Sequence, residues 1–286
     1  MVIRRRYLRL LQQLDLVGID RVKAARGEIV KDQRGKRDVI RLVAGDSVFF
    51  LKRVWKPKFK HGLQALLTRG RVRSQCGIEW DNLRLLRQHR IRTPELVAYG
   101  EEIVNLRERF SFILTRAAPG EMDLRNFVEQ EHDPERRRRV LEALVQGVRR
   151  FHDAGFATPD LFARHLFIEW RGEQPRFTMI DLQRLDRRRR IGDRLRARDL
   201  AALNSSLPNH LVSPAERLRF LEMYRGRRDR AFFSRVRRRM EHLLVRNKRL
   251  NFYTPAPRTS QTLAIGGDGG PAISGKRGRD AVATGW

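Results

Sequence analysis

Asp160, His165 and Asp181 are three polar side chains whose spacing along the chain allows them to meet in space. An apolar strand follows the loop that carries Asp160 and His165, a turn at residues 171–175 reverses the chain, and a second strand leads to Asp181. A hairpin of this kind sets the start of its first strand beside the end of its second. A carboxylate beside an imidazole can chelate Mg²⁺ on a nucleotide, and a further carboxylate can accept a hydroxyl proton. The pattern therefore predicts a phosphotransferase.

Each of these residues alone also has an ordinary structural interpretation. An aspartate that follows a proline in a loop is usually a turn former, and an aspartate at a strand end is often a cap or a surface charge. The combination carries more information: an aspartate, a histidine five positions later, a short hairpin and then a second aspartate.

A β-hairpin of strands at residues 39–43 and 48–53 precedes this segment and adds a lysine. Along its second strand Val48, Phe50 and Lys52 share one face. A lysine at this position is either a surface charge or a side chain that reaches into a cleft to hold phosphates. The glycines before the hairpin are only loosely spaced, which is a weak signal for a phosphate-binding loop.

A helix is expected over about residues 75–89, with Glu79 on the same stripe as two leucines. An acid on an inward stripe needs a cation, and Lys52 is the available partner if the helix packs beside its strand. Strands at about 96–104 and 110–116 follow this helix.

After Ala117 the pattern changes from strands to helices, so the boundary between two lobes is placed there. We expect an N-terminal amphipathic helix at 1–24, a sheet lobe at 25–117, a helical lobe at 118–252 and a disordered tail at 253–286. Residues 214–247 are predicted to add further amphipathic helix. The N-terminal helix could lie on a membrane surface, but docking on its own domain is the favoured interpretation.

The charge of the chain is its most unusual bulk property. Its 286 residues carry a formal net charge of +29, which attracts nucleic acid, an anionic membrane face or a phosphorylated glycolipid. The alternative is that an arginine-rich coding bias has decorated solvated surfaces. The single cysteine, Cys76, excludes an internal disulfide, which suits a reducing cytoplasm. There is no apolar run of transmembrane length.

Taken together, these pieces resemble the protein-kinase-like fold and, more narrowly, the lipopolysaccharide core sugar kinases, the Kdo and heptose kinase family. The resemblance covers roughly residues 25–250. Its most specific stretches are FFLKR at 49–53, GIEWDNLRLLRQHRIRTPELVAYGE at 77–101, HDAGFATPDLFARHLFI at 152–168 and IDLQRL at 180–185. It implies a bilobal α+β fold, with a small N-terminal antiparallel sheet lobe and a larger, mainly helical C-terminal lobe, that uses ATP and Mg²⁺.

The resemblance also implies a nucleotide site in the first lobe. Lys52 would bind the α- and β-phosphates, and Glu79 would hold Lys52 by an ion pair. The backbone around Thr115, Arg116 and Ala117 would receive the adenine.

The catalytic side would come from the second lobe. Asp160 would orient the acceptor hydroxyl and take its proton, while His165 and Asp181 would bind Mg²⁺. Most protein kinases have an asparagine where this chain has His165. Asp199 matches a buried helix aspartate that braces the catalytic loop.

Two departures from the wider kinase pattern shape the expected substrate. Thr158 and Pro159 replace the usual His-Arg before the catalytic aspartate, which leaves the bracing of the loop open. The segment between Asp181 and Asp199 is short and basic, without an Ala-Pro-Glu ending, which argues against a protein substrate. An acidic glycolipid would suit the arginines at 187–190, because guanidinium groups pair with phosphates and carboxylates.

The expected function is therefore ATP-dependent phosphorylation of a sugar hydroxyl on a lipopolysaccharide-core-like glycolipid. The expected protein is a monomer at the cytoplasmic face of the inner membrane. Two alternatives remain. One is a pseudokinase or scaffold that binds a membrane or polyanionic partner through its basic surface. The other is a nucleic-acid-binding protein, for which no recognition motif is visible.

Overall fold

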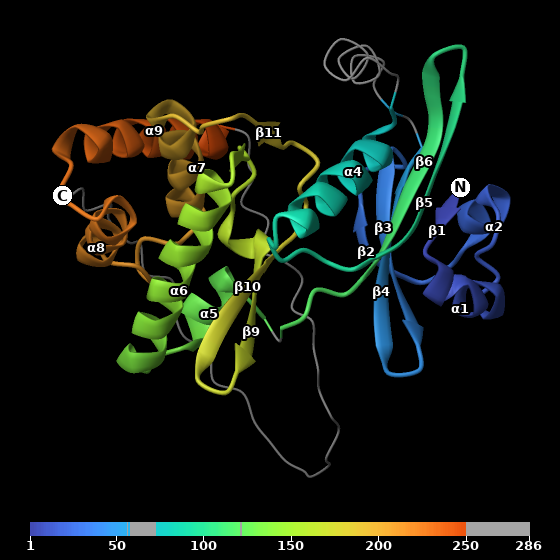
Figure 1. Ribbon diagram of the computed structural model, residues 1–286, viewed down its shortest axis with the longest axis horizontal. Coiled ribbons are helices and arrows are strands. Elements are labelled where there is room, and N and C mark those ends of the chain that lie inside the picture. Colours follow the sequence, from blue (N-terminus) through green and yellow to red (C-terminus); the bar gives the residue numbers. More distant parts are fainter. Residues whose placement is uncertain (56, 58–72, 121, 250–286) are drawn as a thin grey trace, which may run out of the picture.

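The computed structural model describes residues 1–55, 57, 73–120 and 122–249, and these form two parts that lie side by side (Figure 1). The first is built on a six-stranded antiparallel sheet, and the second is mainly helical with two small sheets. This confirms the predicted α+β class, with the sheet first and the helices after it. The predicted disordered tail, residues 253–286, lies outside the described residues.

The N-terminal segment does not form the single amphipathic helix that the sequence predicted. Four short elements replace it: β1 (Val2–Ile3), the 3₁₀ helix η1 (Arg5–Tyr7), α1 (Leu8–Gln13) and α2 (Ile19–Ala24). Asp15 and Gly18 take positive φ angles of 52° and 111°, which interrupt a continuous helix. Leu11, Leu16 and Val22 are buried against the sheet, and β1 pairs with β5, so the segment is docked on its own domain.

The main sheet has the strand order β1-β5-β6-β4-β3-β2. Its longer strands are β2 (Glu28–Asp32), β3 (Arg37–Ala44), β4 (Ser47–Val54), β5 (Leu96–Val104) and β6 (Arg107–Arg116). Side chains alternate between its faces. Phe49 and Leu51 belong to the apolar cluster shared with α1 and α2, whereas Val54 and Ile113 join the cluster of the helical part. Lys52 therefore lies on the face that looks toward the second lobe.

Helix α4 (Gln75–Gln88) packs against β4, β5 and β6 between the two parts (Figure 1). Its N-terminus is capped by Ser74, whose hydroxyl accepts a hydrogen bond from the Gly77 amide at 2.9 Å. Leu83 and Leu86 are buried, and Glu79 is only 6% exposed. The predicted inward stripe with an acid on it is confirmed.

The helical part consists of helices and short strands. Its helices are α5 (Leu124–Gln130), α6 (Pro134–Asp153), α7 (Asp193–Ser205), α8 (Pro214–Arg225) and α9 (Arg230–Arg249). One small sheet joins β7 (Met122–Asp123), β9 (Leu166–Arg171) and β10 (Gln174–Met179), and another joins β8 (Phe156–Ala157) and β11 (Asp186–Arg187). Asp133 caps α6, because its carboxylate accepts hydrogen bonds from two backbone amides of the first turn.

The stretch predicted as further amphipathic helix over 214–247 forms two helices, α8 and α9. Ser213 and Glu216 form a capping box at the start of α8. Gly226 ends α8 with a φ of 69°, a left-handed conformation that glycine adopts without steric cost, and α9 then begins at Arg230. The helical periodicity was correct, but the glycine stop was overlooked.

Candidate active site

Lys52 and Glu79 form the ion pair that their positions on β4 and α4 predicted. The Lys52 ammonium donates to Glu79 Oε2 at 2.6 Å, and the side chains are 14% and 8% exposed. Burial opposes the charged form of Lys52, but the carboxylates of Glu79 and Asp181 outweigh it and raise its pKa. Lys52 therefore stays an ammonium ion throughout the ordinary pH range.

Asp181 lies directly beyond β10 and faces the same lysine. Its Oδ1 accepts a hydrogen bond from Lys52 at 3.1 Å. The Lys52 ammonium holds the pKa of Asp181 well below its usual range, so the carboxylate is ionised. Asp181 has a φ of 54°, which is uncommon outside glycine and is a form of local strain that clusters at functional sites.

The β9–β10 hairpin brings His165 beside Asp181, as the sequence predicted. Leu166 pairs with Met179, and the Ile180 amide donates to the His165 carbonyl at 2.9 Å. As a result, His165 Nε2 and Asp181 Oδ2 are 3.9 Å apart.

The tautomer of His165 follows from its second contact. Its Nδ1 lies 2.9 Å from the backbone carbonyl of Asp160, and because a carbonyl only accepts, Nδ1 carries the proton. Burial lowers the pKa of His165, which favours the neutral ring. Nε2 therefore carries the free lone pair of the ring, which accepts from Arg164 Nε at 3.3 Å and is the one that a metal ion would use if Arg164 moved aside.

The Asp181 carboxylate and the His165 ring nitrogen can serve as two ligands of a metal ion that is also bound by a nucleotide. Among the described residues, no group of three or more His, Cys, Asp or Glu side chains is arranged to hold a metal by itself. Mg²⁺ is usually bound by one or two protein ligands together with substrate phosphates and water. Asp181 and His165 fit that requirement.

The loop that carries Asp160 is braced from behind by Asp199 of α7. The Asp199 side chain is fully buried and accepts hydrogen bonds from the Thr158 amide at 2.6 Å and from Arg198 Nε at 2.8 Å. His152 Nε2 lies 3.2 Å from the same carboxylate. The predicted bracing role of Asp199 is confirmed. Asp199 contacts the backbone N–H of residue 158 and not its side chain, so this contact does not depend on which residue stands there, and threonine is compatible with it.

The side chain of Asp160 is mostly covered and is 15% exposed. Its two carboxylate oxygens are paired with the guanidinium of Arg184, whose Nε donates to Oδ2 at 2.6 Å and whose Nη2 contacts Oδ1. No feature of the sequence analysis predicted this partner.

The segment predicted to receive adenine, Thr115 to Ala117, lies at the end of β6. Two of its amides already have partners: Arg116 donates to the Glu95 carbonyl at 2.9 Å, and Ala117 donates to the Val48 carbonyl at 2.8 Å. A purine would therefore have to use the carbonyl groups of this segment or the next amide, that of Ala118.

The sheet adds one cation that the sequence analysis overlooked. Lys31 pairs in register with Val39, and Val39 pairs with Lys52, so the three side chains share one face. The positive charge of Lys31 adds to the larger effect of Lys52 in lowering the pKa of Asp181.

A polar bridge also ties α4 to the segment that follows Asp181. Asn82 Nδ2 donates to the Leu182 carbonyl at 2.8 Å, and the Gln75 amide oxygen accepts from Gln183 at 3.0 Å and from Arg37 at 2.8 Å. The helix that carries Glu79 is thereby fixed relative to Asp181.

The sequence and the fold of the chain are similar to those of known proteins. The sequence model of the lipopolysaccharide kinase (Kdo/WaaP) family matches residues 20–224. The chain is 29% identical over 246 residues to the lipopolysaccharide core heptose(I) kinase WaaP of Pseudomonas aeruginosa, a match that covers 80% of this chain and 90% of that protein. A WaaP of Escherichia coli is 27% identical over 213 residues, or 72% and 80% of the two chains. A solved structure described as WaaP in complex with acyl carrier protein gives a TM-score of 0.64 at 26% identity and covers 85% of this chain and 98% of that one.

Proposed function

The chain belongs to the lipopolysaccharide kinase (Kdo/WaaP) family, and from this premise we propose that it transfers the γ-phosphate of ATP to a sugar hydroxyl of a lipopolysaccharide-core-like glycolipid. It is a phosphotransferase with an alcohol group as acceptor. The observation that supports the proposal most is the juxtaposition of Lys52, Glu79, Asp181 and His165 from four separate segments.

In this proposal Lys52 binds the α- and β-phosphates, and Glu79 keeps its ammonium in place. Lys31 adds a second cation on the same face, which offsets the lack of a dense glycine loop. The backbone at 115–117 receives the adenine, and Asp181 with His165 holds Mg²⁺. When bound, that ion neutralises the developing charge on the transferred phosphoryl group.

Asp160 is the proposed acceptor-side residue. One of its oxygens accepts the hydrogen bond of the sugar hydroxyl and takes the proton as the hydroxyl oxygen bonds to the γ-phosphorus, while the bond from that phosphorus to the bridging oxygen of ADP breaks and ADP leaves. The bracing of its loop by Asp199 fixes where that oxygen lies, and phosphoryl transfer depends mainly on such positioning.

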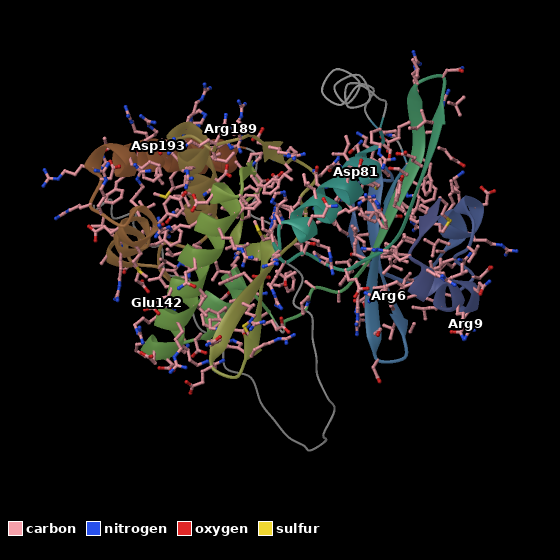
Figure 2. The ribbon with its side chains drawn as sticks, viewed as in Figure 1. Arg6, Arg9, Asp81, Glu142, Arg189 and Asp193 are labelled. Carbon is pink, nitrogen blue, oxygen red and sulfur yellow. The ribbon has the colours of Figure 1, made fainter. Side chains whose placement is uncertain are left out.

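The two runs of four arginines indicate where an anionic acceptor would bind. In the run 136–139 of α6, every guanidinium has a carboxylate partner at 3.2 Å or closer, supplied by this chain. The run 187–190 is exposed and lies beside the catalytic loop, where the Arg188 amide donates to the Gly155 carbonyl. Figure 2 shows Arg189 at the edge of the molecule. We assign this second run to the acceptor side.

The proposed place of action is the cytoplasmic face of the inner membrane, with the protein as a monomer. Among the described residues, no helix combines the length and apolar character that crossing a membrane requires. The basic surface would supply peripheral attachment to anionic headgroups.

A further proposed partner comes from the solved WaaP complex with acyl carrier protein. We propose that this chain also binds an acyl carrier protein, which the sequence analysis did not consider. Co-expression with a tagged acyl carrier protein followed by size-exclusion chromatography tests this. A stable 1:1 peak is expected, and separate elution at moderate salt contradicts it.

Thermal unfolding with and without Mg·ATP tests the nucleotide site. A ligand at 100 times its Kd stabilises the folded state by about 2.7 kcal/mol, a rise of roughly 5–10 °C for a chain of this size. We expect that rise in the wild type, its loss in Asp181→Asn, and its retention in the control Asp20→Asn, whose side chain is 96% exposed. An unchanged wild-type melting temperature at saturating Mg·ATP contradicts the proposal.

A further inference from the structure

Arg184 holds the carboxylate that the proposed function assigns to the acceptor hydroxyl. Its Nε and Nη2 both contact Asp160. Its backbone is fixed by the same loop, because Thr158 Oγ1 donates to the Arg184 carbonyl at 2.7 Å. Arg184 and Asp160 are therefore linked twice, once through side chains and once through the loop that Asp199 braces.

The guanidinium is nevertheless open to solvent. The side chain of Arg184 is 65% exposed, whereas that of Asp160 is 15% exposed. Asp160 occupies the Nε–Nη2 edge, which leaves the Nη1 end of the planar group directed away from it. A guanidinium presents five N–H donors in a fixed fork that matches a carboxylate or a phosphate. Because the Arg184 side chain is exposed, water can replace its contact with Asp160 when the guanidinium swings outward, which opens the carboxylate to a hydroxyl.

The surroundings of this pair are cationic. Arg164 is exposed and donates to His165 Nε2 at 3.3 Å, and the exposed run 187–190 begins three residues after Arg184. An acceptor that approaches Asp160 must pass these guanidinium groups, and an anionic group on it would be attracted to them.

We propose that Arg184 recognises an anionic group, a carboxylate or a phosphate, on the acceptor and thereby sets the acceptor hydroxyl beside Asp160. This rests on the proposed function and adds to it the acceptor chemistry and the residue that reads it. Arg184 is a specificity-determining residue rather than a ligand of the nucleotide, because its partner is Asp160, while Lys52 is the cation beside Asp181.

The test compares three acceptors with four proteins. The acceptors are a purified core oligosaccharide, the same oligosaccharide with its carboxyl groups reduced to alcohols, and the same oligosaccharide after phosphatase treatment. The proteins are the wild type, Arg184→Gln, Arg184→Lys and the control Arg176→Gln, which removes another exposed charge, on β10. The treatment that lowers wild-type kcat/KM shows whether the recognised anion is a carboxylate or a phosphate.

We expect the wild type to lose about tenfold or more in kcat/KM on the acceptor that lacks the recognised anion. Arg184→Gln should lose about as much on the untreated oligosaccharide, mainly through KM, and lose nothing further on the stripped one. Arg184→Lys should be intermediate, since it keeps the charge without the fork, and Arg176→Gln should match the wild type.

Two results overturn the inference alone: a wild type that ignores both treatments, or an Arg184→Gln variant that loses equally on all three acceptors. The second result would assign Arg184 to the phosphoryl group or to loop structure. A folded wild type that binds Mg·ATP but transfers phosphate to none of the three acceptors contradicts the proposed acceptor and, with it, this inference.

Discussion

The loop that carries Asp160 has a buried back and an exposed front, and the two sides use the same kinds of charged groups in opposite surroundings. On the back, Asp199 and His152 have no exposed side-chain surface. On the front, Asp160 is paired with Arg184, which is 65% exposed. A buried charge must keep its partners, whereas an exposed pair exchanges them easily. The back therefore fixes the loop, and the front is free to meet substrates.

The largest expected effect is on the front. Asp160→Asn removes the proton acceptor, and general-base groups contribute about 10²–10⁴-fold, so kcat should fall by that factor. The free energy of unfolding should change by about 1 kcal/mol or less, because asparagine keeps the size of the side chain and the lost ion-pair partner, Arg184, is 65% exposed. Steady-state kinetics and thermal melts measure both.

The matched control for this variant is Asp153→Asn, an exposed aspartate paired with Arg196. Its kcat should equal that of the wild type. If Asp160→Asn is much less stable as well as inactive, Asp160 also stabilises the fold. The two sides of the loop would then not differ in their roles.

The back should show the reverse behaviour. Asp199→Ala leaves the Thr158 amide and the Arg198 guanidinium without their buried acceptor, and breaking a buried pair costs about 3–5 kcal/mol. Chemical denaturation measures the loss. Asp186→Ala is the control, because Asp186 pairs with the same Arg198 from a site that is 37% exposed and should cost about 1 kcal/mol or less. Equal losses in the two variants would contradict the contrast.

The sequence predicted those parts of the site that depend on short-range geometry. Strand alternation placed Lys52 on the face of β4 that looks toward the helical lobe, and the tight β9–β10 hairpin brought His165 to Asp181. Helical periodicity placed Glu79 inward on α4. Each of these positions depends on one element or on one turn, so the neighbouring residues are sufficient to determine it.

Lys31 escaped prediction because its face depends on a β-bulge. Ile29 pairs with Ile40, but the register shifts before Lys31, which then pairs with Val39. Without that shift Lys31 would oppose Asp38 on the other face, away from Lys52. Arg184 escaped for a different reason: its contact with Asp160 depends on the path of the chain after Asp181, which no local pattern encodes.

The pH dependence of stability sharpens the contrast further. Burial lowers the pKa of His152 below its ordinary value of 6.5, although Asp199 opposes the shift. The unfolded chain therefore takes up the proton first, so this contribution to stability is complete above about pH 6.5 and is lost as the pH falls. One proton changes the free energy of unfolding by at most about 1.4 kcal/mol per pH unit.

His152→Gln should flatten the decline in stability between pH 7 and 5, measured by urea denaturation at each pH. His132→Gln, which changes an exposed histidine between α5 and α6, should show the same slope of stability against pH as the wild type. A wild-type slope in both variants would show that His152 does not provide the pH sensitivity of the back.

The smallest expected effect concerns Lys31, whose side chain the β-bulge in β2 turns toward the site. Lys31→Gln should raise the Kd for Mg·ATP about fivefold, or about 1 kcal/mol, the scale of one exposed contact to a phosphate. Arg9→Gln makes the same change of charge on α1, on the far side of the sheet from the helical part (Figure 2), and should leave the Kd unchanged. Because both variants lower the net charge equally, only a local contact can separate them. If titration calorimetry gives the same Kd for Mg·ATP in both variants, Lys31 contributes only through the net charge of the protein. The β-bulge that turns Lys31 toward Lys52 would then have no role in nucleotide binding.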